Sequence, residues 1–467
     1  MVKLILLVVY ICSLITVIFI ERKRPTEALL WTFVMICLPY FGTVLYFVFG
    51  NTTTIKMTAA IRKKRLKKMN KKEPIPHVIS HHCEISQADQ QVMHFNAFYN
   101  ESPVTCYDDI QIYTDGQHHY EQLFEDIHNA KESIMIEFYT IHHDCMGEAL
   151  VEALTKKAKE GLKVMVLCDF IANLSTPQKM YRPLLEAGGQ VIRIKPYFTH
   201  YRSHRKIVVI DQCIGYIGGM NIGKQYANMH KVKTPWRDTQ VRLEGACVEI
   251  LMQYFLTDWM CALTRRYWDC SMDYIMQMEN KDYHHTDHLC QFVVGGVDNN
   301  KESVKMVYMS MIRAAQSKIN IQSPYFIPDA SLLDALKTAL CAGVEVNIMI
   351  PGIKASFFLD PVTRYYCGEL LKYGAHIYKY HGYIHAKTMT IDEDLCAIGS
   401  VNMDIRSLMV DDEICGIFYD NPFVENYVSL YQKDIEHCDV YTLEEYQNRS
   451  QMDKMKEGFY LLFAPLM

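Results

Sequence analysis

The sequence predicts an α/β protein of two duplicated sandwich domains, preceded by a transmembrane helical hairpin. Strand and helix signals alternate through most of its 467 residues, which is typical of layered α/β domains. A segment of the first half recurs about 180 residues later, and a repeat of that length indicates domain duplication rather than a solenoid. Two long uncharged runs open the chain.

Those runs cover residues 4–20 and 28–49, which are 17 and 22 residues long. Both can cross a hydrocarbon core, the first only just. Pro39 and Gly42 predict a kink in the second run, which membrane helices tolerate. A cleaved signal peptide is the alternative, but no small-x-small cleavage site follows the first run. We therefore expect two transmembrane helices in residues 1–50.

The net charge of −5 hides an asymmetry along the chain. Residues 1–72 hold 13 basic and 2 acidic residues, a net charge of +11, so the remainder carries −16. Nine of the basic residues lie in residues 56–72. The positive-inside rule then predicts that everything after Phe49 lies on the cytoplasmic side of the cell membrane, in a multi-pass topology. Residues 51–100 are expected to be a juxtamembrane segment and linker that attracts anionic lipid. The acidic remainder argues against nucleic acid as a partner.

The internal repeat defines the two domains. Strands are expected at residues 134–139, 162–167, 319–323 and 344–350, and helices at 147–160 and 331–342. The two helical segments match at an offset of 182 residues. A turn-rich stretch at residues 295–300 predicts the seam. The first domain is therefore expected to span residues 101–295 and the second 296–467.

Each domain carries one copy of the motif H-x-K-x4-D. The copies are His204, Lys206 and Asp211, and, 181 residues later, His385, Lys387 and Asp392. One such motif recurs by chance too easily to carry weight. Two copies in register, each followed after the same interval by an asparagine (Asn221 and Asn402), are strong evidence of function.

The motifs are expected on strands, where residues two apart share a face, so each histidine and lysine project together. Asp211 and Asp392 belong to the motif's catalytic set, but they have the opposite parity, which favours a role in the following turn or a salt bridge. The carboxylates that orient the imidazoles must then come from elsewhere. The candidates are Glu413, 28 residues after His385, in the second half, and Asp238 in the first.

If the two halves face each other, two imidazoles, two lysines and two amides surround one point. That arrangement suits phosphoryl transfer, where positioning and charge stabilisation dominate. One histidine is expected to attack phosphorus and form a phospho-histidine. The other, protonated, is expected to donate to the leaving alcohol and then to accept a proton from the incoming hydroxyl. Because lysines supply the positive charge, we expect no metal and no other cofactor.

The paired motifs resemble the phospholipase D superfamily, and the likeness to bacterial cardiolipin synthases extends over nearly the whole chain. The segments that carry it are residues 24–31, 38–42, 45–50, 235–239, 399–407 and 463–466. The resemblance implies a shared active site at the interface of the two domains. It also implies that two phosphatidylglycerols become cardiolipin and glycerol, with anionic phospholipids and the membrane as partners.

The resemblance also implies roles for single residues. His204 would be the nucleophile and His385 the acid/base, with Lys206, Lys387, Asn221 and Asn402 binding the phosphate and Ser400 near it. Asp238 and Glu413 match the family's histidine-orienting acids.

The sequence departs from the family pattern at Ser203, at residues 224–225, at Ala355 and at residues 411–412. None of these changes removes a catalytic group, and we expect these positions on the rim of the site, where they tune donor or acceptor preference.

Four alternatives share parts of this pattern. A phospholipase D that hydrolyses phosphatidylcholine, or transfers its phosphatidyl group to other alcohols, would have the same site, and so would a phosphatidylserine synthase. A nuclease of the superfamily would need a basic cleft, which the charge of −16 disfavours. A membrane-anchored scaffold with a dead site is disfavoured by the intact duplicate set of histidines, lysines and asparagines.

Overall fold

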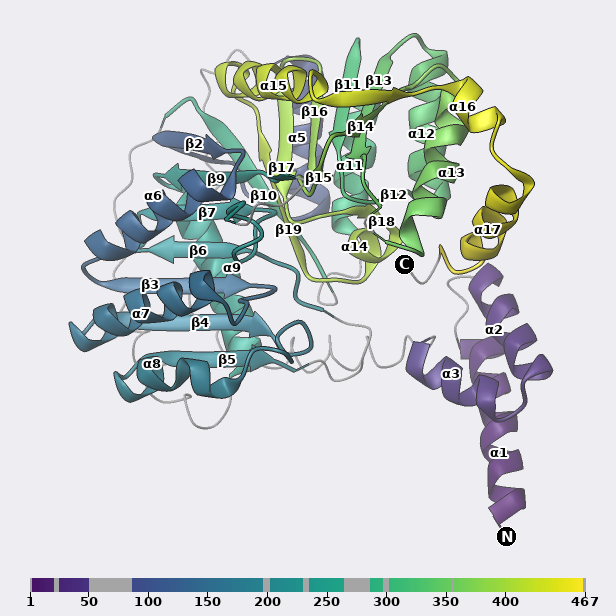
Figure 1. Ribbon diagram of the computed structural model, residues 1–467, viewed down its shortest axis with the longest axis horizontal. Coiled ribbons are helices and arrows are strands. Elements are labelled where there is room, and N and C mark those ends of the chain that lie inside the picture. The colour runs from purple at the N-terminus through teal and green to yellow at the C-terminus, as the bar shows by residue number, and fades with distance from the viewer. Residues whose placement is uncertain are drawn as a thin grey trace.

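The computed structural model describes residues 2–20, 25–49, 86–195, 202–229, 235–263, 286–296, 302–354 and 356–464. Two α/β units lie next to each other, and three N-terminal helices extend from the same end of the molecule as the C-terminal helix (Figure 1). Most of the basic juxtamembrane segment and of the expected seam lies outside the described residues.

The N-terminal apolar runs form shorter helices than the sequence predicts. Helix α1 (Val2–Ile15) continues as a π-helical turn, and the second run is divided into α2 (Pro25–Cys37) and α3 (Phe41–Phe49). The division falls at Pro39, which has no backbone N–H to continue a helix, and at Tyr40, whose φ is 64°. Within the described residues, no single helix is long and apolar enough to cross a membrane.

The first domain is built on a seven-stranded sheet. Its strand order is β2 (Asp109–Tyr113), β9 (Gln240–Glu244), β7 (Ile214–Gly218), β6 (Ile207–Ile210), β3 (Ser133–Phe138), β4 (Lys163–Asp169) and β5 (Gln190–Ile194). Alternate side chains of β3 face opposite layers, as the pleat requires. Ile134 and Ile136 pack under α6 (Gly116–Asn129) and α7 (Cys145–Lys159), whereas Met135 packs against α9 (Cys247–Ala262) on the other face.

The second domain is built on a nine-stranded sheet. Its order is β1 (Thr105–Cys106), β10 (Leu289–Gly295), β19 (Glu413–Phe418), β17 (Leu395–Gly399), β16 (Thr388–Ile391), β11 (Lys318–Gln322), β13 (Glu345–Pro351), β14 (His376–Tyr380) and β20 (Cys438–Tyr441). One face is covered by α5 (Gln87–Tyr99), α11 (Ser303–Ala314), α12 (Ala330–Cys341) and α13 (Leu359–Leu371). Helix α15 (Asn421–Ile435) packs on the other face.

The duplication is confirmed by the register of the sheets. Strand β3 pairs antiparallel with β6, with Ile134 opposite Ile210, and β11 pairs antiparallel with β16, with Ile319 opposite Ile391. The expected strands and helices of both halves form within two residues of their predicted bounds. The domain boundary predicted after residue 295 assigns β1 and β10 to the first domain, and this is wrong. Both strands belong to the sheet of the second domain, where β1 pairs with β10 and β10 pairs with β19.

The two domains share a hydrophobic core, which positions their motifs. One buried cluster contains Trp259 of α9, Phe292 of β10 and Tyr427 of α15 together with residues of both sheets. The two sheets approach each other so closely that a Cβ added at Gly416 of β19 would lie 2.6 Å from the Cδ1 atom of Ile217 in β7. The domains are therefore packed as one body with a common interior between α9 and α15.

Candidate active site

The two motif histidines lie where the domains exchange backbone hydrogen bonds. The His204 N–H donates to the Asp412 carbonyl (2.8 Å), and the His385 N–H donates to the Arg237 carbonyl (2.6 Å). In the second case the short strand β15 (Tyr383–Ile384) pairs in parallel with β8 (Trp236–Arg237). The residues just before each histidine are thus held against the other half of the protein.

This exchange brings each imidazole to the carboxylate of the opposite half. His204 Nδ1 lies 2.9 and 3.1 Å from the two Glu413 oxygens, and His385 Nδ1 lies 2.5 Å from Asp238 Oδ2. The sequence predicts the two acids correctly as the partners of the imidazoles but pairs each with the histidine of its own half, and that pairing is wrong. Asp238 and Glu413 directly follow the paired segments, so parallel pairing carries each acid across to the other domain.

The two lysines lie beside the imidazoles, as the i, i+2 spacing predicts. Lys206 Nζ donates to the His204 carbonyl (2.5 Å), and Lys387 Nζ donates to the His385 carbonyl. Burial lowers the pKa of Lys206 to about 7 and that of Lys387 to about 8. Repulsion from Lys387 lowers the pKa of Lys206 further. The site therefore concentrates positive charge that an anionic ligand would stabilise.

The imidazoles and their carboxylates differ in protonation. Burial, followed by the nearby lysines, lowers the pKa of His204 well below its usual value and that of His385 to about 3. Burial raises the pKa of Glu413 to about 7. Burial alone would raise the pKa of Asp238, but the attraction of its carboxylate to Lys387 and His385 is stronger, and the pKa of Asp238 is lowered. Near neutral pH, Asp238 is thus ionised, whereas Glu413 is close to its midpoint.

The predicted phosphate-binding residues are only partly available. Asn221 is engaged on both sides of its amide, accepting from the Thr140 N–H (3.2 Å) and donating to the Tyr226 hydroxyl (2.9 Å). The Oδ1 atom of Asn402 is buried and has no hydrogen-bond partner among the described residues. Ser400 differs from the prediction, because its hydroxyl donates to Glu413. It therefore holds the orienting acid rather than presenting its proton to a phosphate.

The motif aspartates, which the sequence analysis also counts in the catalytic set, hydrogen-bond to turns, as their opposite parity favours. Asp211 accepts backbone N–H bonds from Lys131 (2.7 Å), Glu132 (2.8 Å) and Ser133 (2.9 Å). Asp392 does the same for Gln316 (2.9 Å), Ser317 (2.8 Å) and Lys318 (2.7 Å). Each aspartate ties the end of its motif strand to the start of the neighbouring strand, with φ near +50°.

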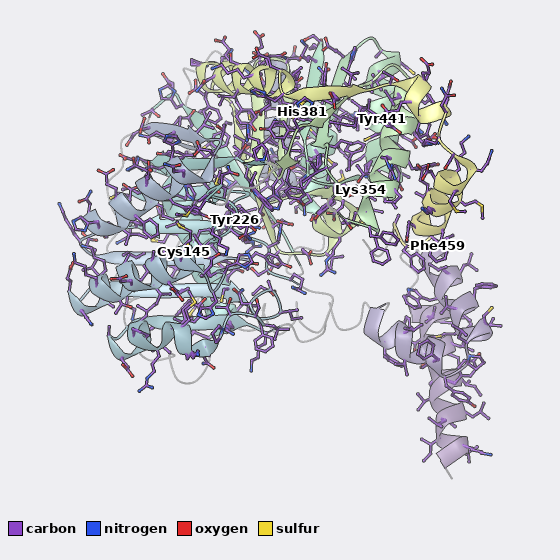
Figure 2. All side chains as sticks on the ribbon, in the orientation of Figure 1. Cys145, Tyr226, Lys354, His381, Tyr441 and Phe459 are labelled. Carbon is purple, nitrogen blue, oxygen red and sulfur yellow. The ribbon has the colours of Figure 1, made fainter. Side chains whose placement is uncertain are left out.

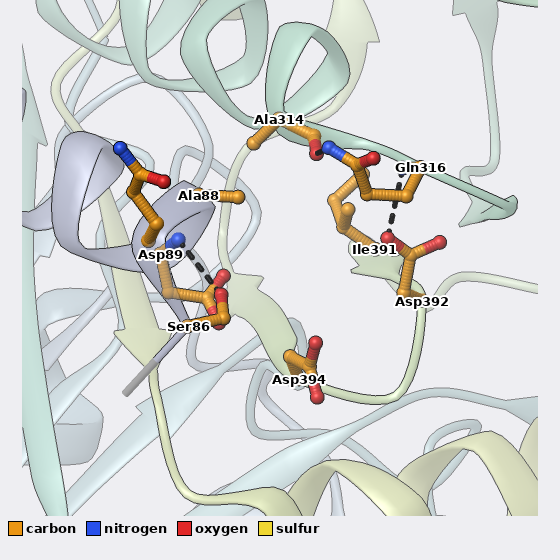
Figure 3. Close-up of a pocket in the computed structure, with 9 residues that line it drawn as sticks. Ser86, Ala88, Asp89, Ala314, Gln316, Ile391, Asp392 and Asp394 are labelled. Carbon is orange, nitrogen blue, oxygen red and sulfur yellow. Dashed lines mark hydrogen bonds between the residues drawn. The ribbon is translucent and has the colours of Figure 1, made fainter. Parts of the chain in front are cut away.

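Figure 3 shows Asp392 beside a cavity of about 240 Å³, which Asp89 and Asp394 also line. Neither motif histidine lines this cavity. The carboxylate of Asp392 therefore faces a different region of the second domain from the imidazole of His385.

Aromatic side chains form walls that the sequence analysis missed. The Tyr139 ring lies 4.7 Å from the His204 ring, and the rings of Trp236, Tyr383 and Tyr226 lie 5.2, 5.8 and 6.0 Å from that of His385. Figure 2 shows Tyr226 at the junction of the two domains. A signal was present for Tyr383, because it precedes His385 by two residues in an extended segment and so shares its face.

The rim location expected for the departures from the family pattern is wrong for three of them. Ser203, Asp411 and Asp412 are buried. The Ser203 hydroxyl donates to Glu137 (2.7 Å), and Asp411 accepts from Arg406 (2.8 and 3.1 Å). These residues support the strand exchange behind the histidines. Ala355 lies outside the described residues.

A duplicated α/β fold with one His–Lys pair per half, gathered at a single junction, defines the phospholipase D-like class of proteins. Sequence comparisons agree with this class. The family described as "Cardiolipin synthase, PLD-like domain" matches residues 123–233 and 308–435, and the family "Phospholipase_D-nuclease N-terminal" matches residues 6–51. The chain belongs to the bacterial cardiolipin synthase family of the phospholipase D superfamily.

Similar proteins include the major cardiolipin synthase ClsA of Bacillus subtilis, which is 34% identical over 97% of this chain and 96% of its own. The cardiolipin synthase of Oceanobacillus iheyensis is 34% identical over 98% of both chains. Among solved structures, the phosphatidylserine synthase of Haemophilus influenzae covers 81% of this chain and 97% of its own, with a TM-score of 0.62 and 17% identity. That likeness shows the common fold.

Proposed function

We propose that this protein is a cardiolipin synthase that transfers the phosphatidyl group of one phosphatidylglycerol to the headgroup hydroxyl of another and releases glycerol. The observation that carries the proposal is the junction itself, where each imidazole has a carboxylate on Nδ1 and a lysine beside it. The relatives named as cardiolipin synthases align over nearly the whole chain, which favours this reaction over others of the class.

The first chemical step is assigned to His204 as nucleophile. Its Nδ1 is held near Glu413, which leaves Nε2 free to attack phosphorus. The N–P bond forms as the bond from phosphorus to the glycerol oxygen breaks, and His385 donates a proton to that oxygen. Lys206 and Lys387 offset the charge on the phosphate oxygens. The phosphate charge in turn raises the pKa of His385, so that this imidazole carries its proton when substrate is bound.

The second step returns the enzyme to its starting state. The headgroup hydroxyl of the second phosphatidylglycerol loses its proton to His385 and attacks phosphorus, and the N–P bond to His204 breaks. The two carboxylates favour His204 as nucleophile and His385 as acid/base. Ionised Asp238 makes His385 the more basic imidazole, as an acid/base requires. Glu413, with its pKa near 7, leaves His204 neutral and nucleophilic.

The N-terminal helices are proposed to anchor the enzyme at the membrane that holds its substrate. Many of their large apolar side chains are exposed, among them Leu4 (65%), Leu29 (70%) and Phe33 (64%). Burying this apolar surface in a bilayer would stabilise the membrane-bound state by about 25 cal/mol per Å² of area removed from water. The basic residues that follow the second run support a two-pass arrangement with the catalytic domains on the cytoplasmic side.

The function is tested by incubating the purified full-length protein with phosphatidylglycerol as the only lipid and separating the products. Cardiolipin and glycerol in equal amounts are expected. Phosphatidic acid without cardiolipin would assign the protein to the hydrolases instead. Cardiolipin analogues made only when another alcohol is added, with none from phosphatidylglycerol alone, would point to a transphosphatidylase or a phosphatidylserine synthase.

A chelator is expected to leave the rate of cardiolipin formation unchanged. The two lysines supply the charge stabilisation that a divalent ion gives in other phosphoryl transfer enzymes. Turnover should be measured before and after extended treatment with excess chelator. Activity that is lost and then restored by a divalent ion would contradict this assignment of the lysines.

The lysine pKa values predict how substrate binding depends on pH. In the empty site Lys206 has a pKa of about 7 and Lys387 of about 8, so both are charged below these values and neutral above them. We expect the KM for phosphatidylglycerol to rise as pH increases through this window. The bound phosphate keeps the lysines protonated, so kcat should fall only at higher pH. A KM that is constant across the window would show that the lysines stay charged without substrate.

A further inference from the structure

Large apolar side chains are exposed together at one place on the catalytic domains. In the described residues after Phe49, this place holds seven of them, in residues 357–358 and 452–463. They are Phe357 (72% exposed), Phe358 (57%), Met452 (59%), Met455 (69%), Phe459 (57%), Leu462 (64%) and Phe463 (43%). We call these residues the apolar surface. Such a concentration marks an interaction site more often than chance exposure.

Most of this surface belongs to α17 (Gln451–Leu461), which is apolar on two sides. Its inner side carries Tyr460 and, beyond the helix end, Ala464, both buried against the second domain. Its outer side carries Met452, Met455 and Phe459 at positions i, i+3 and i+7, which lie on one face of a helix. A helix that needed only to pack on the domain would be polar on that outer side.

The two parts of the apolar surface are joined through Tyr460. Its ring lies 5.7 Å from that of Phe357 and 5.4 Å from that of Phe358, and the Phe459 and Phe463 rings lie 5.4 Å apart. Three exposed lysines flank this surface in sequence, namely Lys354, Lys454 and Lys456. Aromatic and aliphatic side chains with basic neighbours are typical of helices that lie in the headgroup region of anionic membranes.

The apolar surface is linked to the active site by a short series of contacts. Helix α13 begins directly after Phe358, and its Thr363 accepts the backbone N–H of Phe326 (3.3 Å). The preceding residue, Tyr325, hydrogen-bonds through its hydroxyl to that of Tyr383 (3.1 Å), and the Tyr383 ring stacks 5.8 Å from that of His385. These contacts connect the apolar surface, through α13 and Tyr325, to the side of the site that holds His385.

We propose that the apolar surface docks the catalytic domains onto an anionic lipid bilayer, in addition to the anchor formed by the N-terminal helices. Those helices lie at the same end of the molecule as α17 (Figure 1), and Figure 2 shows Phe459 at that end. The proposal takes its choice of partner from the proposed function, which requires a lipid substrate. Docking keeps the His385 side of the site turned toward the membrane between turnovers.

The test uses the full-length protein reconstituted into phosphatidylglycerol-containing vesicles whose lipids are brominated on the acyl chains, since bromine quenches nearby indoles. Phe459→Trp places an indole on the apolar surface, and Phe98→Trp is the matched control. Phe98 is 87% exposed on α5 and does not belong to the apolar surface. We expect the emission added by Phe459→Trp to be mostly lost in brominated vesicles and that added by Phe98→Trp to be retained. Equal emission from both variants in brominated and unbrominated vesicles would overturn the proposal.

A second measurement links docking to turnover. The double substitution Phe357→Ser/Phe459→Ser should lower the ratio of turnover on bilayers to turnover on short-chain phosphatidylglycerol dispersed as monomers by several-fold. An unchanged ratio would contradict the proposal. A lower molar mass of the double variant than of the unchanged protein in detergent would also contradict it, because the apolar surface would then bind a second copy of the chain. Quenching requires no turnover, so failure of the proposed reaction and failure of docking are distinguishable.

Discussion

Replacing His204 by alanine is expected to abolish both cardiolipin formation and the covalent phosphatidyl adduct. His204 is the residue proposed to attack phosphorus and to be regenerated when the second lipid takes the phosphatidyl group. His385→Ala should lower turnover by about 10²–10⁴-fold, the scale of a lost general acid–base contribution. The two variants should differ with an activated donor, phosphatidyl-p-nitrophenol, whose leaving group needs no proton. With it, His385→Ala should release p-nitrophenol and accumulate adduct, whereas His204→Ala should do neither.

The measurement is a burst of p-nitrophenol together with mass spectrometry of the modified peptide. His118→Ala is a suitable control, because His118 is an exposed histidine on α6 that pairs with Asp115. This variant should behave like the unchanged protein. An adduct on His385 that survives in His204→Ala would reverse the two roles.

The crossed pairing of acids and histidines predicts a second large effect. Glu413→Gln should slow adduct formation by about 10²–10⁴-fold even with the activated donor, because Glu413 holds the nucleophile His204. Asp238→Asn should slow the reaction with phosphatidylglycerol to a similar extent but be largely rescued by the activated donor, because Asp238 holds the proton donor His385. The comparison is made by single-turnover kinetics with both donors.

Pairing within each half would give the opposite result. Asp238→Asn would then disable the nucleophile, and Glu413→Gln would be the variant that the activated donor rescues. Both substitutions keep the shape of a buried side chain, so thermal unfolding of each variant serves as the control for folding. A variant that unfolds like the original protein but loses only one of the two activities reports on the site alone.

Much of the fold follows from local patterns in the sequence. The β-branched and apolar run at residues 134–138 forms β3, and Gly161, with φ of 96°, lies just past the end of α7. Hydrophobic periodicity and glycine placement act over a few residues, so a single sequence reveals them. The same is true of the motif spacing, which places each lysine beside its own histidine. The break of the second apolar run at Tyr40 was less evident, because Pro39 allows either a kink or a full interruption.

The duplicated motifs and their candidate reacting groups were determined by the sequence itself, because residue type and spacing define them. Glu413 was named from its spacing, whereas Asp238 was named from its surrounding motif. Only the tertiary structure decided which acid meets which histidine. Parallel pairing between β8 and β15, segments that lie in different halves of the chain, transfers Asp238 to His385 and, by the equivalent contact at Asp412, Glu413 to His204. The same pairing brings the Trp236 ring to 5.2 Å from that of His385. Spacing along the chain cannot encode such contacts, since they form between surfaces that meet only when both domains are folded.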